Sequence, residues 1–348
     1  MLLLSLSLFG CSSNSSKNKT TSIYLAGATN ANENFFSNAL TSSVATYWEN
    51  GTATNLTSGT GNNQAVAIAV DNSGNVYTAG FTTSATTGYS IATYWKNSTL
   101  VNLTNGTTSG ASTNGIAVDS SGNVYVAGNT NLGPTVWKNG APTYLTNGAG
   151  GAWGITIDSS NNVYVSGYTF SSTTGNTVAT VWKNGVPTYL TDGSMEAYGN
   201  QIKVDSSDNV YVAGSTFSAS TRNSIATYWK NGVETSLADG SVATWGEPIT
   251  FDNSGNVYTG GFTTSATNGN RIATYWKNST AVPLTDGSSE AQLIGIAVDS
   301  DGNVYAAGYT QSTTTGNWIA TYWLNGTPTN LTDGTSDAIL QGIALSTE

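Results

Sequence analysis

The chain offers few side chains for acid-base chemistry. Its 348 residues include no histidine, and the only cysteine is Cys11. Ser-His-Asp and Cys-His nucleophile systems, zinc sites built on His or Cys, c-type haem and disulfides all need residues that the chain lacks. We therefore expect no cofactor and no metal, and catalysis would have to use carboxylates, tyrosines and arginines.

Several charged residues differ from copy to copy of the repeat described below. They are Glu196, Glu247, Glu290, Asp337, Arg222 and Arg271. These side chains are the right types for a polar binding surface, or for the acid-base pair that glycoside hydrolysis requires. Solvated loop charge is the other interpretation. No feature of the sequence marks a shifted pKa, so no catalytic residue is predicted.

Aromatic residues also occur outside the regular part of the repeat. They are Trp153, Tyr198, Trp245, Trp318, Phe35 and Phe36. Aromatic rings at a concave rim can stack on sugars or anchor a protein partner. Alternatively, these rings cover the ends of neighbouring sheets. With the charged residues above, they form the candidate ligand site.

A cassette of about 47 residues recurs along the chain and must position these residues. Residues 115 to 148 show it as GIAVDSSGNVYVAG...TVWKNG...TYLTNG. Seven copies are marked by a Val-Tyr or Ile-Tyr pair that begins at Ile23, Val76, Val124, Val163, Val210, Val257 and Val304. Self-similarity at this period, with four short strand patterns per copy, is typical of a β-propeller blade.

The third copy shows the four predicted strands, A to D. They are Gly115 to Val118, Val124 to Gly128, Thr135 to Trp137 and Thr143 to Leu145. An Asp-x-x-Gly-Asn loop joins A to B and Asn-Gly joins C to D, and both are strong turn signals. We interpret the aspartates of the first loop as Asx-turn residues rather than calcium ligands. The tryptophan of strand C is predicted to pack between blades.

The first and last fragments predict how the ring closes. The repeats open with a B strand, Ile23 to Gly27, and end with an unpartnered A strand, Gly342 to Leu345. Pairing of these two strands leaves no free edge. We expect an all-β, seven-bladed propeller of four-stranded blades, forming one domain over residues 23–348.

The repeats resemble the bacterial SBBP β-propeller repeat. Its G-I-A-V-D-x-x-G-N-V-Y run is matched closely from Gly295 to Tyr305, and the resemblance covers Ile23 to Leu345. A shorter segment, Ala226 to Gly232, resembles the W-x-N-G part of HAF extracellular repeats. The resemblance implies a propeller at the cell surface or envelope and no particular activity.

The amino terminus resembles a bacterial lipobox. An apolar run, Leu2 to Phe9, precedes Gly10-Cys11 and is too short to span a bilayer. The resemblance implies a signal peptide over residues 1–10, lipid on Cys11 and a tether over residues 11–22. The basic n-region is missing, and an apolar leader with an inert cysteine is the alternative. The expected location is the bacterial envelope, periplasmic or surface-exposed.

The net charge excludes one class of partner, and the variation of the loops indicates which face carries the function. The net charge of −10 opposes nucleic-acid binding. The B-to-C and D-to-A loops vary between copies and should share one face, which is where function is expected. Trp153, Tyr198 and Trp245 are predicted in D-to-A loops, with Glu247 nearby. Lys203 interrupts the Ile-Ala-Val pattern of strand A, and either points into the channel or reaches solvent along its stem.

The primary hypothesis is a non-enzymatic, lipid-anchored propeller that binds a glycan or protein through this face. A polysaccharide lyase or glycoside hydrolase using the carboxylates remains an alternative. A purely structural surface protein is the third.

Overall fold

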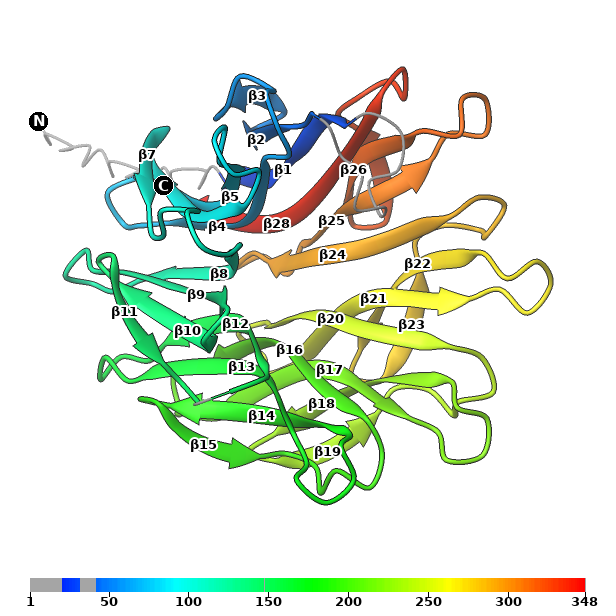
Figure 1. The fold of residues 1–348 in the computed structure, drawn as a ribbon. Coiled ribbons are helices and arrows are strands. Elements are labelled where there is room, and N and C mark those ends of the chain that lie inside the picture. The colour runs from blue at the N-terminus through cyan, green and yellow to red at the C-terminus, as the bar shows by residue number, and fades with distance from the viewer. Residues whose placement is uncertain (1–20, 32–41, 147, 348) are drawn as a thin grey trace, which may run out of the picture.

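The computed structural model describes residues 21–31, 42–146 and 148–347, and the regular elements in these ranges are β-strands (Figure 1). Seven four-stranded antiparallel sheets form a ring of blades, which confirms the predicted seven-bladed propeller. Within the same ranges, no helix is long and apolar enough to cross a membrane.

Each blade contributes one strand of each class, ordered A, B, C and D from the channel outwards. The A strands are β4 (Gln64–Val70), β8 (Ser112–Val118), β12 (Gly151–Ile157), β16 (Ala197–Val204), β20 (Thr244–Phe251), β24 (Ala291–Val298) and β28 (Asp337–Thr347). The B strands are β1 (Thr21–Ala31), β5 (Val76–Thr83), β9 (Val124–Thr130), β13 (Val163–Phe170), β17 (Val210–Phe217), β21 (Val257–Thr264) and β25 (Val304–Gln311). The C strands are β2 (Val44–Glu49), β6 (Ser90–Lys96), β10 (Gly133–Lys138), β14 (Thr177–Lys183), β18 (Ser224–Lys230), β22 (Arg271–Lys277) and β26 (Trp318–Leu324). The D strands are β3 (Thr52–Asn55), β7 (Thr99–Asn102), β11 (Ala141–Tyr144), β15 (Val186–Tyr189), β19 (Val233–Ser236), β23 (Thr280–Pro283) and β27 (Thr327–Asn330).

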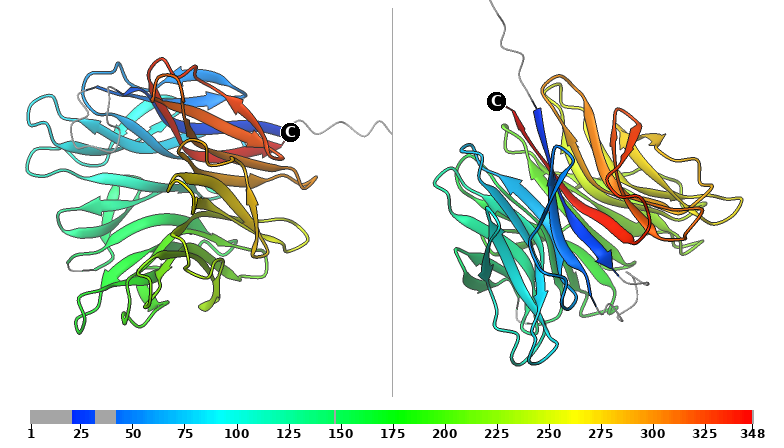
Figure 2. Two further views of the ribbon diagram at one scale, coloured as in Figure 1. Left: turned by 90° about the vertical axis from the view of Figure 1, so that its right-hand side faces the viewer. Right: turned by 90° about the horizontal axis from the view of Figure 1, so that it is seen from above.

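The two ends of the chain close the ring, as predicted. Strand β28 pairs antiparallel with β1, and Ile23 lies opposite Leu345. Figures 1 and 2 show β28, in red, beside β1, in blue. Leu340 on β28 is fully buried and packs with Leu25 and Trp48 of the same blade. The last strand of the sequence therefore completes the first blade and its core.

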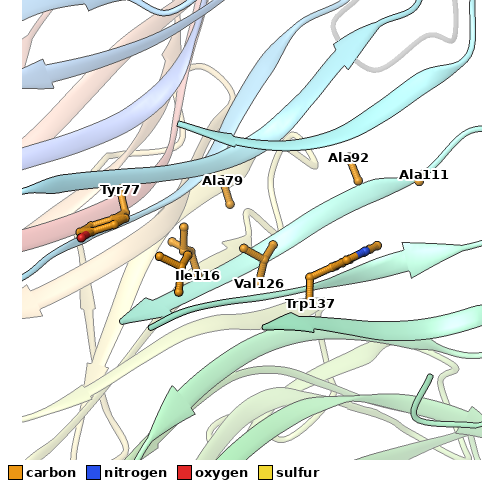
Figure 3. Packing of buried hydrophobic residues seen from close by; sticks show 8 residues of the cluster. Tyr77, Ala79, Ala92, Ala111, Ile116, Val126 and Trp137 are labelled. Carbon is orange, nitrogen blue, oxygen red and sulfur yellow. The ribbon is translucent and has the colours of Figure 1, made fainter. Parts of the chain in front are cut away.

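Tryptophans of the C strands form the core between blades. The seven rings are at most 1% exposed, and they are Trp48, Trp95, Trp137, Trp182, Trp229, Trp276 and Trp323. Figure 3 shows Trp137 in a cluster with Tyr77 and Ala92 of the preceding blade. Large rings fill the space that widens between twisted sheets, so the predicted packing role is confirmed.

The A-to-B turns are closed by their aspartates. In the third copy, Asp119 Oδ1 accepts hydrogen bonds from the backbone N–H of Ser121 and Asn123, at 2.9 and 2.8 Å. Its Oδ2 accepts from Asn123 Nδ2 and the Tyr125 hydroxyl, at 2.8 and 3.3 Å. The same bonds recur at Asp71, Asp158, Asp205, Asp252 and Asp299. These carboxylates are Asx-turn residues, and their oxygens are used within the turn.

Leu340→Ala tests the closure. Truncating a fully buried leucine leaves a cavity beside Leu25 and Trp48, so the free energy of unfolding should fall by about 2–5 kcal/mol. The matched control is Leu100→Ala on β7, where the leucine is 49% exposed and the expected change is within about 0.5 kcal/mol. Denaturant unfolding measures both, and equal effects would contradict a closure that depends on β28.

Candidate functional site

Every A strand carries a β-bulge near its start. In the third blade, Thr113 pairs with Gly128 and Gly115 pairs with Ala127, so Asn114 has no partner across the ladder. The corresponding bulge residues of the seven blades are Val66, Asn114, Trp153, Asn200, Glu247, Ile294 and Gln341. A bulge releases a residue from the pleat and re-aims its side chain.

A glycine on strand B accompanies each bulge. At Gly128, an added Cβ would overlap the carbonyl oxygen of Ser112 on the A strand. The same close approach to an A-strand carbonyl occurs at Gly27, Gly80, Gly167, Gly214, Gly261 and Gly308. The glycine that ends every V-Y-x-x-G or equivalent run is therefore required because the bulge brings two backbones together.

The seven bulge residues meet around one hollow. They line a funnel of about 400 Å³ at one mouth of the central channel. Gln64, Gln201, Trp245, Gln292, Tyr309 and Ile339 line it as well. The A strands begin at this mouth, directly after the D-to-A loops. The hollow therefore lies on the face where the sequence predicted function.

Four aromatic residues cluster beside the funnel and are called the aromatic wall: Trp153, Tyr168, Tyr198 and Trp245. Of these, Trp153 and Trp245 line the funnel itself. The rings of Trp153 and Tyr198 stack with centroids 5.6 Å apart and planes at 19°. The ring centroid of Trp245 lies 5.7 Å from that of Tyr198, and Tyr168 meets Trp153 edge-on at 5.2 Å. The wall is a continuous, partly exposed π surface beside the funnel.

The structure corrects the expected location of these residues. Trp153, Tyr198 and Trp245 were predicted in D-to-A loops, but they lie on β12, β16 and β20. Glu247 was predicted near those loops and is also on β20. The A strands start several residues before the Gly-Ile-Ala-Val run because pairing with strand B continues beyond the bulge.

Glu247 is held by a polar network. Its Oε2 accepts a hydrogen bond of 3.0 Å from Gln292 Nε2. Gln292 Oε1 accepts in turn from Arg271 Nη1 and the Tyr309 hydroxyl, each at 2.9 Å. Arg271 Nε lies 3.9 Å from Glu290 Oε2. Gln292 thus stands between the carboxylate of Glu247 and the guanidinium of Arg271.

The position of Glu247 raises the pKa of its carboxyl group. Desolvation by burial raises its pKa from 4.5 to about 7, although the bond from Gln292 and the charge of Arg271 act in the opposite direction. Among the described residues that line the funnel, Glu247 is the only carboxylate. The site therefore has one carboxyl group that changes charge near neutral pH.

Amide side chains connect neighbouring A strands around the funnel. Asn114 Nδ2 donates to the Ala152 carbonyl at 2.8 Å, and Asn200 Nδ2 donates to the Gly246 carbonyl at 2.6 Å. Asn200 Oδ1 is buried and accepts no hydrogen bond from the described residues. Amides offer both donors and acceptors, so this part of the funnel suits a hydroxylated ligand.

Other predicted site residues have structural contacts. Glu290 and Asp337 accept bonds from the backbone N–H of Arg271 and Trp318, at 3.1 and 2.6 Å, at the first residue of a C strand. The Trp318 ring packs edge-on against Tyr309 at 4.9 Å and supports the funnel from behind. The acidic pair therefore fixes strand ends rather than lining the funnel.

Two predicted residues lie away from the funnel. Glu196 is exposed and lines a separate hollow with Phe217 and Glu234. Arg222 is exposed in a B-to-C loop with a φ of 63°, in a turn where other copies have glycine. Phe35, Phe36 and Cys11 lie outside the described residues. The structure thus brings together only part of the predicted set.

Sequence reasoning missed most of the bulge ring. Val66, Asn114, Asn200, Ile294 and Gln341 were not among the predicted site residues. A signal for them exists, because the position before the start of the Gly-Ile-Ala-Val run is occupied by Val, Asn, Trp, Asn, Glu, Ile and Gln. Side chains of such different size and polarity at one repeat position indicate that the packing of the blade does not dictate the residue there.

Lys203 points into the channel, which decides between the two interpretations of its position. It lines the part of the channel beyond the funnel, where the equivalent residues of other blades include Ala117, Thr156 and Ala297. The amine is exposed to channel water but surrounded by protein, and this desolvation lowers its pKa.

Known proteins match this chain in its repeats and in its fold. The SBBP β-propeller repeat matches residues 99–132 and 287–313. A sequence search of curated proteins finds no match. Among solved structures, the chain is similar to a PL25 ulvan lyase, with 12% identity and a TM-score of 0.52 over 84% of this chain and 89% of the lyase. It is also similar to a puromycin hydrolase, with 10% identity and a TM-score of 0.56 over 80% of this chain and 48% of the hydrolase. At these identities the likeness shows the fold alone.

Glu247→Gln tests the raised pKa. Between the ordinary value of 4.5 and about 7, the folded protein holds a proton that the unfolded chain has released. This stabilising contribution is full below pH 4.5 and is lost as the pH rises towards 7. Glutamine does not ionise, so the variant does not lose this contribution as the pH rises. The melting temperature of the variant minus that of wild type should therefore increase by about 2 °C or more between pH 5 and pH 8. The exposed control Glu234→Gln should show no such trend; a flat difference for Glu247→Gln would refute the shift.

Proposed function

We propose that the protein is a non-enzymatic glycan-binding propeller of the bacterial envelope. The SBBP-type repeats and the seven-bladed ring support this proposal. The ligand occupies the funnel formed by the seven bulge residues. The observation that carries the proposal is that Trp153 and Trp245 of the aromatic wall line one hollow together with amide side chains.

The chemistry of the funnel matches that of a sugar. A sugar ring presents C–H groups on its faces and hydroxyls at its edge. Trp153 and Trp245 offer apolar surface for the faces, while Asn114 and Gln341 offer amide groups for the hydroxyls. Mostly apolar hollows with a few placed polar groups are typical small-ligand sites.

The size of the funnel favours a short glycan over a protein partner. Small-molecule sites occupy about 300–1,000 Å³, and the funnel is about 400 Å³. A stable protein interface buries about 800 Å² on each partner. The aromatic and amide groups lie within the channel mouth. A slender ligand can reach them there, whereas the flat surface of a protein partner cannot.

The same residues support binding more than catalysis. Hydrolysis of a glycoside by the common mechanism needs two carboxyl groups on either side of the bond. Glu247 alone among the described lining residues is a carboxylate. The Tyr309 hydroxyl is bonded to Gln292, and burial raises its pKa, so it is a poor base for a lyase reaction.

A lipid on Cys11 would orient the funnel away from the membrane. Strand β1 begins at Thr21, close to the C-to-D turn, where Asn50 Oδ1 accepts a bond from the Ile23 N–H. This is the face opposite the start of the A strands. A tether that reaches Thr21 from Cys11 therefore approaches the invariant turns and leaves the funnel open to ligand.

Trp153→Ala and Trp245→Ala test the proposal. Loss of either ring removes stacking area beside the funnel, so affinity for a short oligosaccharide found on a glycan array should fall by about tenfold or more. Tyr189→Ala is the matched aromatic control, because Tyr189 is 63% exposed on β15 and far from the channel. Calorimetric titration measures the affinities.

Two results would contradict this function. Equal affinity of Trp153→Ala and wild type for the oligosaccharide would exclude the funnel as its site. Cleavage of the oligosaccharide by wild type, abolished in Glu247→Gln, would establish the enzymatic alternative instead.

A further inference from the structure

We propose that the group bound beside Glu247 is a protonated amine, so that the funnel selects glycans with free amino groups over neutral or acidic ones. This inference rests on the proposed function and names the ligand class of the same site.

Glu247 keeps part of its hydrogen-bonding capacity for a ligand. Oε2 accepts from Gln292 Nε2 at 3.0 Å, and Oε1 accepts no hydrogen bond from the described residues. The side chain lines the funnel. A carboxylate accepts several hydrogen bonds, and bonds from a charged donor are about twice as strong as neutral ones.

No basic side chain of the described residues lines the funnel to neutralise Glu247. Arg271 is engaged by Gln292 and Glu290, and its guanidinium carbon lies 5.0 Å from the Phe262 ring centroid. Lys203 lies farther along the channel. The charge of Arg271 acts on Glu247 but does not outweigh the desolvation of its carboxylate. A uronate or sulfate group beside this carboxylate adds a second negative charge, so acidic glycans are disfavoured.

Three other features favour a cation over a neutral group. Indole rings attract ammonium groups through the ring quadrupole, and Trp153 and Trp245 line the funnel. The burial that raises the pKa of Glu247 is an electrostatic cost of the ionised form, which an adjacent ammonium relieves. The net charge of −10 also draws cationic ligands towards the protein.

A matched pair of sugars tests the inference. The probes are a hexasaccharide of β-1,4-linked glucosamine and its fully N-acetylated counterpart, titrated calorimetrically at neutral pH and moderate salt. Wild type should bind the amino form about tenfold more tightly, which corresponds to about 1.4 kcal/mol. In Glu247→Gln, the ratio of the two affinities should fall to about one, because the neutral amide no longer favours an ammonium group.

Control variants separate this inference from the proposed function. Glu196→Gln removes an exposed carboxylate outside the funnel and should keep the tenfold preference for the amino form. If Glu196→Gln lost this preference, the amine would be attracted by the overall negative charge of the protein and not by Glu247. Trp153→Ala should weaken binding of both probes. Equal binding of the probes to wild type, or a preference retained in Glu247→Gln, overturns the amine while leaving glycan binding intact. Failure of both probes to bind, or binding of both unaffected by Trp153→Ala, overturns the proposed function as well.

Discussion

A bulge in each innermost strand is the constraint on which the site depends. The extra residue cannot pair across the ladder. Two residues before it, the A-strand carbonyl comes so close to strand B that only glycine fits there, as at Gly128 and Gly214. In return, the side chain of the extra residue is free to face the channel mouth. Each of the seven blades has this bulge and glycine. The seven bulge residues therefore form a ring in which each position can vary independently.

The scaffold separates stability from recognition. Inter-blade tryptophans such as Trp137, and turn aspartates such as Asp119, recur with the same contacts in almost every blade. They tolerate little change because each fills a buried space or satisfies several backbone donors. The bulge positions make few such contacts, and one ring can therefore carry Trp153, Glu247 and Gln341 side by side with apolar residues.

The sequence predicts the fold well because its signals are local and repeated. The Asn-Gly turns, the C-strand tryptophans and the unpaired fragments at residues 23–27 and 342–345 predict blade structure, blade number and closure. The site is predicted only in part, since Trp153, Trp245 and Glu247 were found as exceptions to the repeat. Asn114 and Gln341 were missed because their convergence depends on the ring, which places residues from distant copies around one axis. The network through Gln292 depends on three-dimensional pairing, and the sequence does not show it.

The central claim is that seven bulge residues build one ligand site at the channel mouth. A crystal structure with a bound glucosamine oligosaccharide tests it most directly. We expect a sugar ring against Trp153 or Trp245, with an amine at Glu247 Oε1. A ligand bound on the face of the A-to-B turns, or on the outer D strands with the funnel empty, would contradict it.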